Sequence, residues 1–508
     1  MFGSFLLLCA PFAVKSSMKK YAHLIMLAAM FALFCVSRVA TLLSAGSLWF
    51  DEAFSAHVAT LPWNEAQAML AYEHNPWLPF LLWRLVAFFS PSDLAFRLPS
   101  LIAGMCSFGL VALISWRLWQ SKAAMLGTSF LFTLSSLLLY HQTEARMYSL
   151  VVLFALAMVA ASFEWLRQPS RWMLMVSAIA TVALVHTHLT AWLPAAIVIA
   201  LVAFEARQQS RPIYVYLACH AAAFVSGFIW LIPVIYHRIS VAAVSQGWFF
   251  SQNSDSFFGP HLVNLLLNGE PRLLPRVLAG IILCILLCAA LVSDLRTHKI
   301  TPDRPSLDLA LWLAGIFAAG LALQTPVTKY LMIAVIPVML LAGLGFSKLP
   351  RRIAIALAAV LFVIAAPMHA HLLGKRHHWD EAAQRVAALQ AQYDDQVTIA
   401  HSFIAALPLQ RYLPAGHEVI PFIPLDGALT LDQAISRYNW LPIIDQTNIE
   451  RLDALSANKG HIILVSTTVA SNESDPVKAR LWQQGWKLLE RYTYSGYGDP
   501  EILLFAKP

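Results

Sequence analysis

The chain has 508 residues, of which 59% are hydrophobic and 12% charged, and its mean hydropathy is +0.63. Soluble proteins carry about 25% charged residues, so a water-soluble shell over most of the length is excluded. The net charge of +7 is scattered between apolar runs, which favours contact with anionic lipid over binding of nucleic acid. The composition is that of a polytopic membrane protein.

Long apolar runs, taken in chain order, predict about eleven membrane-spanning helices, because about 20 apolar residues cross a bilayer. The first six are expected at 21–43, 94–116, 123–139, 148–165, 172–186 and 190–204. The others are expected at 214–236, 277–295, 307–323, 331–346 and 353–368.

Basic residues predict how these helices are oriented in the membrane. They gather in alternate short loops, such as Arg117 with Lys122 and Arg351 with Arg352. Because basic loops stay on the cytoplasmic side, the tail 1–20 is expected in the cytoplasm. An odd number of spans then places the C-terminus outside.

Two long loops, 45–93 and 237–276, are expected on the outer face. Residues 77–89 in the first loop are too few to span and include Arg84, so they predict an amphipathic helix lying on the membrane surface. The second loop has about 40 residues, a length typical of functional loops.

Acidic residues become frequent after His371, where the membrane domain (21–370) gives way to a different composition. Short strands are expected at 397–400, 462–465 and 501–505, with helices at 381–392 and 476–491. Residues 371–508 contain no cysteine, so no disulfide framework is implied. The predicted fold class is an α-helical polytopic membrane protein with a small external α/β domain at 371–508.

Unusual polar residues lie at the outer ends of the predicted spans. They are Asp51, Glu52, His74, Glu144, Arg146, His186, His188, Lys329 and Tyr330. Ion and proton pumps usually need such groups near the bilayer centre. A shared depth at the outer face instead indicates one cavity at the membrane interface, which suits an enzyme acting on a partly lipidic substrate.

Each of these residues also has a structural interpretation. Asp51 and Glu52 could favour the N-terminus of a following helix through its dipole. Glu144 and Arg146 could form an exposed ion pair worth about 0–1 kcal/mol. Lys329 could be an interfacial anchor whose charge reaches the headgroups.

The stretch Ser47-Leu48-Trp49-Phe50-Asp51-Glu52-Ala53 resembles the acidic motif that ends the first span of GT-C glycosyltransferases. The similar branch is that of bacterial protein-mannosyltransferase-like and aminoarabinose-transferase-like enzymes. Further matching motifs, in the expected order, are His74-Asn75-Pro76, Arg97-Leu98-Pro99-Ser100, Glu144-Ala145-Arg146-Met147-Tyr148 and Thr328-Lys329-Tyr330-Leu331. Where this chain has His74-Asn75-Pro76, the family more often has His-Pro-Pro. Where this chain has Lys329 before Tyr330, the family more often has Arg.

The resemblance implies transfer of a sugar from a polyprenyl-phosphate carrier to an envelope glycan, lipid or protein. The expected location is the outer face of a bacterial inner membrane. Asp51 matches the family's catalytic aspartate and is the expected general base, with Glu52 as the second catalytic carboxylate. Arg146 and Lys329, with Tyr330, are expected to meet the charge that develops on the leaving phosphate.

The remaining motif residues, His74, Glu144 and Tyr148, are expected to line the substrate site. Some members of the family bind a divalent metal and others do not, so the cofactor stays open. Glu52, Glu144 and His188 are the candidate metal ligands.

Two other functions fit a polytopic chain: a flippase or transporter for lipid-linked sugars, and a non-catalytic membrane assembly protein. A soluble domain on one side and the lack of an evident internal repeat disfavour a transporter. Retention of both Asp51 and Glu52 disfavours a non-catalytic role.

Overall fold

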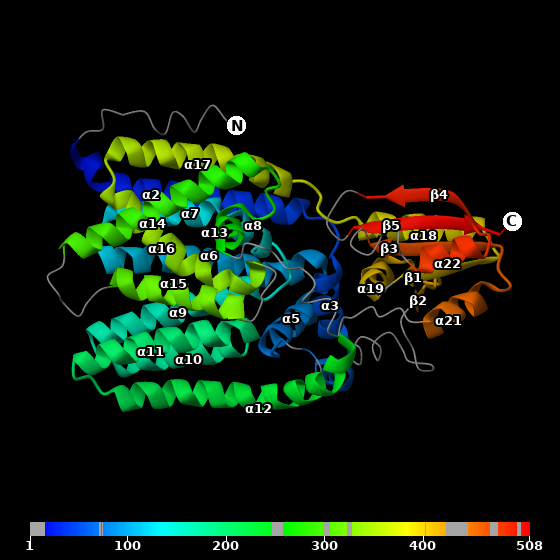
Figure 1. Ribbon diagram of the computed structural model, residues 1–508, viewed down its shortest axis with the longest axis horizontal. Helices are drawn as coiled ribbons and strands as arrows, with labels where there is room; N and C mark the ends of the chain where they lie inside the picture. The colour runs from blue at the N-terminus through cyan, green and yellow to red at the C-terminus, as the bar shows by residue number, and fades with distance from the viewer. Residues whose placement is uncertain are drawn as a thin grey trace.

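The computed structural model describes residues 16–70, 73, 75–245, 258–297, 305–322, 328–401, 403–422, 446–467, 476–494 and 499–507. These residues form a bundle of long helices and, at one end of it, a smaller α/β domain (Figure 1). Most of the predicted N-terminal tail lies outside the described residues.

The bundle is built from helices that coincide with each of the apolar runs predicted to span. They are α2 (Ser16–Ser44), α6 (Asp93–Trp119), α7 (Lys122–Leu134), α8 (Ser136–His141), α9 (Tyr148–Arg167), α10 (Arg171–Val185), α11 (Trp192–Gln208), α12 (Ile213–Ser245), α14 (Leu273–Thr297), α15 (Pro305–Ala322), α16 (Val335–Lys348) and α17 (Arg351–Leu372). Eight of the described helices are long and apolar enough to cross a membrane, whereas α7, α10 and α15 are shorter apolar helices. The chain is a multi-pass membrane protein, and the total of eleven spans stays a prediction.

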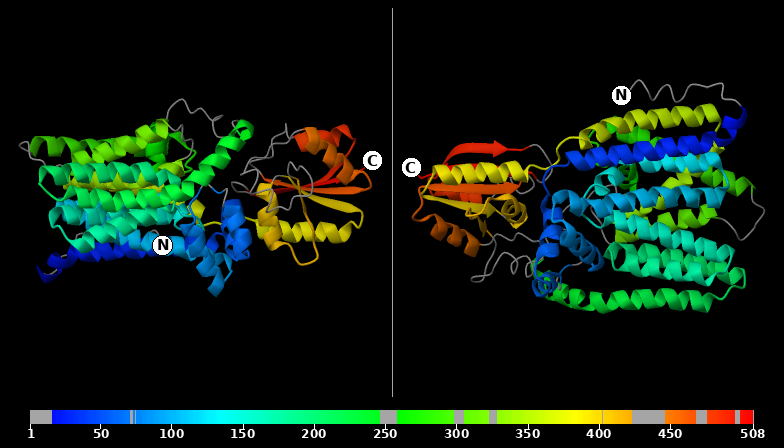
Figure 2. Two further views of the ribbon diagram at one scale, coloured as in Figure 1. Left: turned by 90° about the horizontal axis from the view of Figure 1, so that it is seen from below. Right: turned by 180° about the vertical axis from the view of Figure 1, so that it is seen from behind.

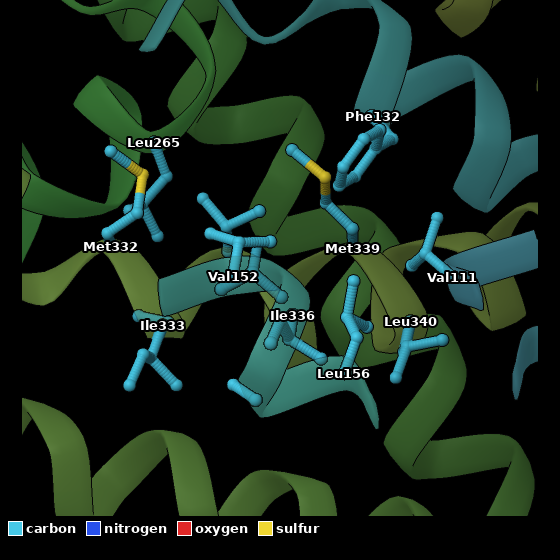
Figure 3. Packing of buried hydrophobic residues seen from close by; sticks show 14 of the residues in the cluster. Val111, Phe132, Val152, Leu156, Leu265, Met332, Ile333, Ile336, Met339 and Leu340 are labelled. Carbon is cyan, nitrogen blue, oxygen red and sulfur yellow. The ribbon is translucent and has the colours of Figure 1, made fainter. Parts of the chain in front are cut away.

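Apolar side chains cover both the inside and the outside of the bundle. Outward-facing Trp172, Ile229 and Val363 are 70%, 71% and 68% exposed, as expected for surfaces that contact lipid. Inside, Ile336 and Met339 of α16 share a buried core with Phe132 of α7 and Leu156 of α9 (Figure 3). All residues from Val335 to Phe346 are buried, so α16 lies in the interior of the bundle.

Three short helices lie between the bundle and the C-terminal domain (Figure 2). They are α3 (Phe50–Thr60), α4 (Trp63–Leu70) and α5 (Leu78–Phe89). Helix α5 has 12 residues, in agreement with the short helix predicted at 77–89. The aromatic side chains of Phe54, Phe80 and Trp83 form a separate core there, which also includes Leu407 of the C-terminal domain.

The segment 237–276 is more helical than the sequence predicted. Helix α12 continues to Ser245, and α13 (Phe258–Leu267) forms a further short helix before α14. Buried His261 of α13 pairs its Nδ1 with the Thr328 hydroxyl at 2.8 Å, so this segment contacts the turn η2 (Thr328–Ala334).

The C-terminal domain is a five-stranded mixed sheet of order β2-β1-β3-β5-β4 with helices against it. The strands are β1 (Gln396–His401), β2 (Ile420–Phe422), β3 (His461–Thr467), β4 (Lys487–Thr493) and β5 (Pro500–Ala506). The helices are α18 (Trp379–Gln392), α19 (Phe403–Tyr412), α21 (Gln446–Ser456) and α22 (Pro476–Gln483). β1 is parallel to β2 and β3, whereas β5 is antiparallel to β3 and β4.

The predicted strands at 397–400, 462–465 and 501–505 are confirmed as β1, β3 and β5. The predicted helix at 476–491 is wrong in its second half. It ends at Gln483, Gly485 follows with φ of +83°, and the chain then pairs with β5 as strand β4.

Two glycines, Gly343 and Gly345, let α16 approach its neighbours closely. A Cβ at Gly345 would lie 2.1 Å from the Leu286 carbonyl oxygen, whereas a Cβ at Gly109 in α6 would meet nothing within 4 Å. We expect Gly345→Ala to cost about 1–3 kcal/mol of stability through overpacking. Gly109→Ala is the matched control and should leave the melting temperature in detergent unchanged or raised, because alanine favours helix. Equal melting temperatures for the two variants would contradict the close packing.

Candidate active site

The motif Trp49–Glu52 begins helix α3 directly after the first long helix. α2 ends at Ser44, Gly46 adopts a φ of +75°, and Trp49 precedes the first residue of α3. Neighbouring residues on a helix point about 100° apart, so Asp51 and Glu52 face different surroundings.

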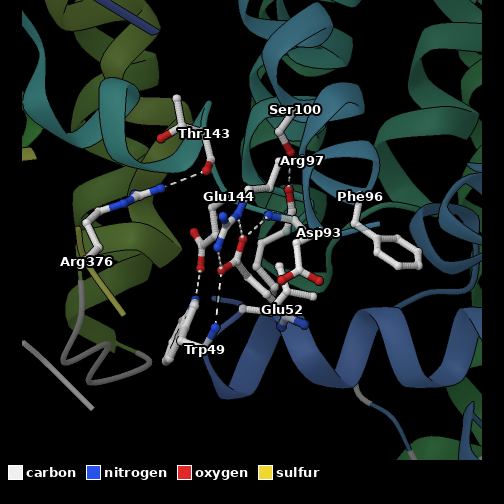
Figure 4. Close-up of polar contacts among 12 residues, drawn as sticks. Trp49, Glu52, Asp93, Phe96, Arg97, Ser100, Thr143, Glu144 and Arg376 are labelled. Carbon is white, nitrogen blue, oxygen red and sulfur yellow. Dashed lines mark hydrogen bonds and ion pairs between the residues drawn. The ribbon is translucent and has the colours of Figure 1, made fainter. Parts of the chain in front are cut away.

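Glu52 is buried and accepts hydrogen bonds at both oxygens (Figure 4). Arg97 of α6 donates from Nε and Nη2, each at 2.7 Å, and the Ala145 backbone N–H donates at 2.8 Å. Burial alone would raise the pKa of Glu52, but the Arg97 guanidinium outweighs it and holds the pKa below its ordinary value. Glu52 is thus a fixed anion that joins α3, α6 and the loop 142–147.

Asp51 lies between two cations. Its Oδ2 is 3.4 Å from Lys329 Nζ of η2 and 3.8 Å from Arg146 Nε. The Asp51 and Lys329 side chains are 18% and 21% exposed, whereas those of Glu52 and Arg146 are 1% and 6% exposed. Asp51 and Lys329 are therefore the most accessible charged groups of this cluster, with Arg146 directly behind Asp51.

Three aromatic rings surround the Lys329 ammonium. Nζ lies 5.7 Å from the centre of Trp49, 5.5 Å from Tyr148 and 5.6 Å from Tyr330. Such rings stabilise a cation through their quadrupoles. Their contribution lets Lys329 keep its charge with only partial pairing to Asp51.

The loop 142–147 is held from several sides. Glu144 is buried, accepts from the Trp49 indole N–H at 2.8 Å and pairs with His141 Nδ1 at 2.7 Å. The Arg146 carbonyl accepts from the Ser100 hydroxyl at 2.9 Å. Glu144 and Arg146 are therefore buried parts of the site, and the interpretation as an exposed surface pair is wrong.

The structure brings most of the predicted site residues to the end of the bundle that faces the C-terminal domain. They are Asp51, Glu52, Glu144, Arg146, Tyr148, Lys329 and Tyr330. His188 also lies there, with ring centres 5.5 Å from Tyr148 and 5.9 Å from Tyr330. His74 lies outside the described residues, and the His186 side chain pairs with the Ser226 hydroxyl of α12.

Within the described part of the chain, no group of three or more His, Cys, Asp or Glu side chains is arranged to hold a metal ion. Both oxygens of Glu52 and both oxygens of Glu144 already take part in hydrogen bonds, so the metal ligands Glu52, Glu144 and His188 stay a prediction.

Two buried arginines near the site were missed in the sequence. Arg38 of α2 donates to Gln142 Oε1 and to the Thr133 carbonyl, each at 2.9 Å. Arg376 donates to the Thr143 carbonyl at 2.8 Å and stacks over the Tyr140 ring. Arg38 could have been recognised from the sequence, because an arginine inside an apolar run needs a hydrogen-bonding partner within the protein.

The Glu52–Arg97 pair gives a prediction about stability. Glu52→Gln leaves the Arg97 charge uncompensated, which should cost about 3–5 kcal/mol, whereas Asp51→Asn should change the melting temperature little. The pKa of Glu52 is depressed in the fold, so its contribution is present above the ordinary value of about 4.3 and lost as pH falls below it. Thermal melts in detergent between pH 7 and pH 3 test both points. A pH dependence of melting that is the same in wild type and Glu52→Gln would contradict them.

No protein-family model matches the sequence, and no curated protein is significantly similar to it. The fold is similar to the crystal structure of ArnT from Cupriavidus metallidurans bound to undecaprenyl phosphate, with a TM-score of 0.58 and 12% identity over 95% of this chain and 97% of that one. The apo state of ArnT gives a TM-score of 0.57 and 13% identity over 96% and 98% of the two chains. The expected GT-C resemblance is confirmed for the fold, while the branch within it stays a prediction. Over nearly its whole length this chain is therefore similar in fold to ArnT from Cupriavidus metallidurans.

Proposed function

We propose that this protein is a membrane glycosyltransferase that moves a sugar from a polyprenyl-phosphate carrier to an acceptor in the cell envelope. The observation that carries the proposal is an accessible carboxylate, Asp51, between the cations Lys329 and Arg146 at one end of a membrane bundle. The similarity to ArnT, a protein seen with undecaprenyl phosphate, supports the lipid carrier. The proposed setting is the outer face of a bacterial inner membrane.

Asp51 acts as the general base in this proposal. An acceptor hydroxyl attacks the anomeric carbon of the sugar while Asp51 takes its proton. The bond between that carbon and the phosphate oxygen breaks, and its electron pair leaves with the polyprenyl phosphate. Asp51 is suited to this role because it is partly exposed, whereas Glu52 is saturated by its donors.

Lys329 and Arg146 stabilise the leaving phosphate, whose negative charge grows as the bond breaks. In the free protein both cations face the Asp51 carboxylate. A donor phosphate competes for the same cations, so its arrival weakens their hold on Asp51. Donor binding thereby makes Asp51 a stronger base at the moment when a base is needed.

The acceptor is proposed to approach between the bundle and the C-terminal domain. An envelope glycan, a lipid and a protein all carry the hydroxyl groups that this chemistry requires. Glu144 and Tyr148 line the donor side, next to Trp49 and Lys329.

Asp51→Asn removes the base and keeps the side-chain shape. We expect release of polyprenyl phosphate from polyprenyl-phosphate sugar, with envelope extract as acceptor, to fall at least about 100-fold in detergent. Glu65→Gln, which neutralises an exposed carboxylate on α4, is the control and should keep wild-type activity. Undiminished release by Asp51→Asn would refute the assignment. A flippase would release no lipid phosphate in detergent from either protein.

Substitutions of Lys329 separate charge from shape. Lys329→Met should weaken inhibition by undecaprenyl phosphate and lower turnover, each by about tenfold or more, because a charge-assisted contact is lost. Lys329→Arg keeps the cation and matches the family's more common residue. It should therefore retain most of the inhibition by undecaprenyl phosphate and most of the turnover. Titration of wild type and variants with undecaprenyl phosphate measures this, and equal losses in the two variants would argue against phosphate binding at Lys329.

A further inference from the structure

The segment that enters the C-terminal domain, 375–379, runs alongside the segment 45–47 that precedes the catalytic motif. Gly46 pairs with His377 as a parallel bridge, and the Trp379 backbone N–H donates to the Ser47 hydroxyl at 2.7 Å. A Cβ at position 46 would lie 2.4 Å from the His377 carbonyl oxygen, so only glycine permits this approach. The linker is thus fixed against the site.

The His377 side chain continues this contact into the site. Its ring stacks on the Trp49 indole, with centres 6.0 Å apart and planes 18° apart. Trp49 in turn donates to Glu144 at 2.8 Å and presents its face to Lys329. The Trp49 indole thus contacts both His377 and Lys329, the lysine proposed to bind the donor phosphate.

The other partner of His377 belongs to the C-terminal sheet. Asp499, directly before β5, is fully buried and lies 3.6 Å from His377 Nδ1 and 2.9 Å from His378 Nδ1. Asp499 holds the His378 ring by a hydrogen bond and meets the His377 ring in a longer, weaker contact. The sheet and the Trp49 indole are therefore connected through one imidazole.

We propose that Asp499 and His377 are positioning residues that couple the C-terminal domain to the donor site by holding Trp49 against Lys329. The proposal rests on the proposed function, in which Lys329 binds the donor phosphate. A shift of the sheet, such as one caused by an acceptor bound to the C-terminal domain, would pass through His377 to Trp49 and change the surroundings of Lys329.

A second contact between the domains offers a control that bypasses Trp49. Arg411 of α19 donates to Asp93 Oδ1 at 2.7 Å and 3.0 Å, at the start of α6. Loss of this contact loosens the docking of the domain without touching the His377–Trp49 stack. Exposed His371, in the last turn of α17, supplies a second control.

The experiment compares His377→Ala, His377→Phe and Asp499→Asn with the controls His371→Ala and Arg411→Gln in the full-length protein. We expect His377→Ala to lower kcat roughly tenfold or more, since misplacement of a catalytic environment is costly, with little change in the KM for donor. His377→Phe keeps a ring against Trp49 and should retain most of the wild-type kcat. The kcat of Asp499→Asn should lie between those of His377→Ala and His377→Phe. In a Trp49→Phe background the effect of His377→Ala should shrink, because the two residues act in one chain of contacts.

Labelling with an amine-reactive reagent provides a readout that does not depend on sugar transfer. Loss of the His377 ring should increase the modification of Lys329, measured by mass spectrometry, while both controls stay at the wild-type level. If His377→Ala matches His371→Ala in rate and labelling, or if Arg411→Gln produces the same losses, the coupling is refuted. A wild-type protein that labels as expected but transfers no sugar would instead refute the proposed function.

Discussion

The buried ion pair between Glu52 and Arg97 is the constraint on which the site depends. Removing two charges from water is costly, and the cost is offset only when their geometry is good and their other donors and acceptors are satisfied. Arg97 meets this demand by also donating to the Gly46 and Ser47 carbonyls, at 2.8 Å and 2.9 Å. The start of α3 is therefore fixed to α6, and the direction of Asp51 follows from its place one residue before Glu52.

The charged residues around Asp51 fall into two groups: those that hold the structure together and those that a substrate can contact. Glu52 and Arg97 neutralise each other and are closed to solvent, whereas Asp51 and Lys329 are held more loosely at 3.4 Å and stay partly exposed. Aromatic rings stabilise the Lys329 ammonium without occupying its three hydrogens with strong acceptors. A cation stabilised in this way can exchange a carboxylate for a phosphate at low cost, which a saturated pair cannot do.

The sequence predicted the helices of the bundle well because apolar length alone determines whether a segment can lie in lipid. It also predicted that Asp51, Arg146 and Lys329 lie at the same depth in the membrane. It could not tell that, of the neighbouring carboxylates Asp51 and Glu52, Glu52 is the buried one. That distinction depends on Arg97, which lies 45 residues away in the chain. Strand β4 was missed because Lys487–Thr493 is mostly exposed at a sheet edge and shows no apolar alternation.

The contacts around 45–48 show why the C-terminal domain is part of the scaffold of the site. This stretch connects α2 to α3, so its backbone groups need partners from elsewhere. The Ala45 carbonyl accepts from the Arg376 N–H at 3.2 Å, and the Leu48 N–H donates to the Tyr412 hydroxyl at 2.6 Å. Residues from the linker and from α19 thus hold the same short segment that Arg97 holds from the membrane side. Because Trp49 and Asp51 follow directly, the linker and α19 help to fix the groups proposed to bind the donor and to activate the acceptor.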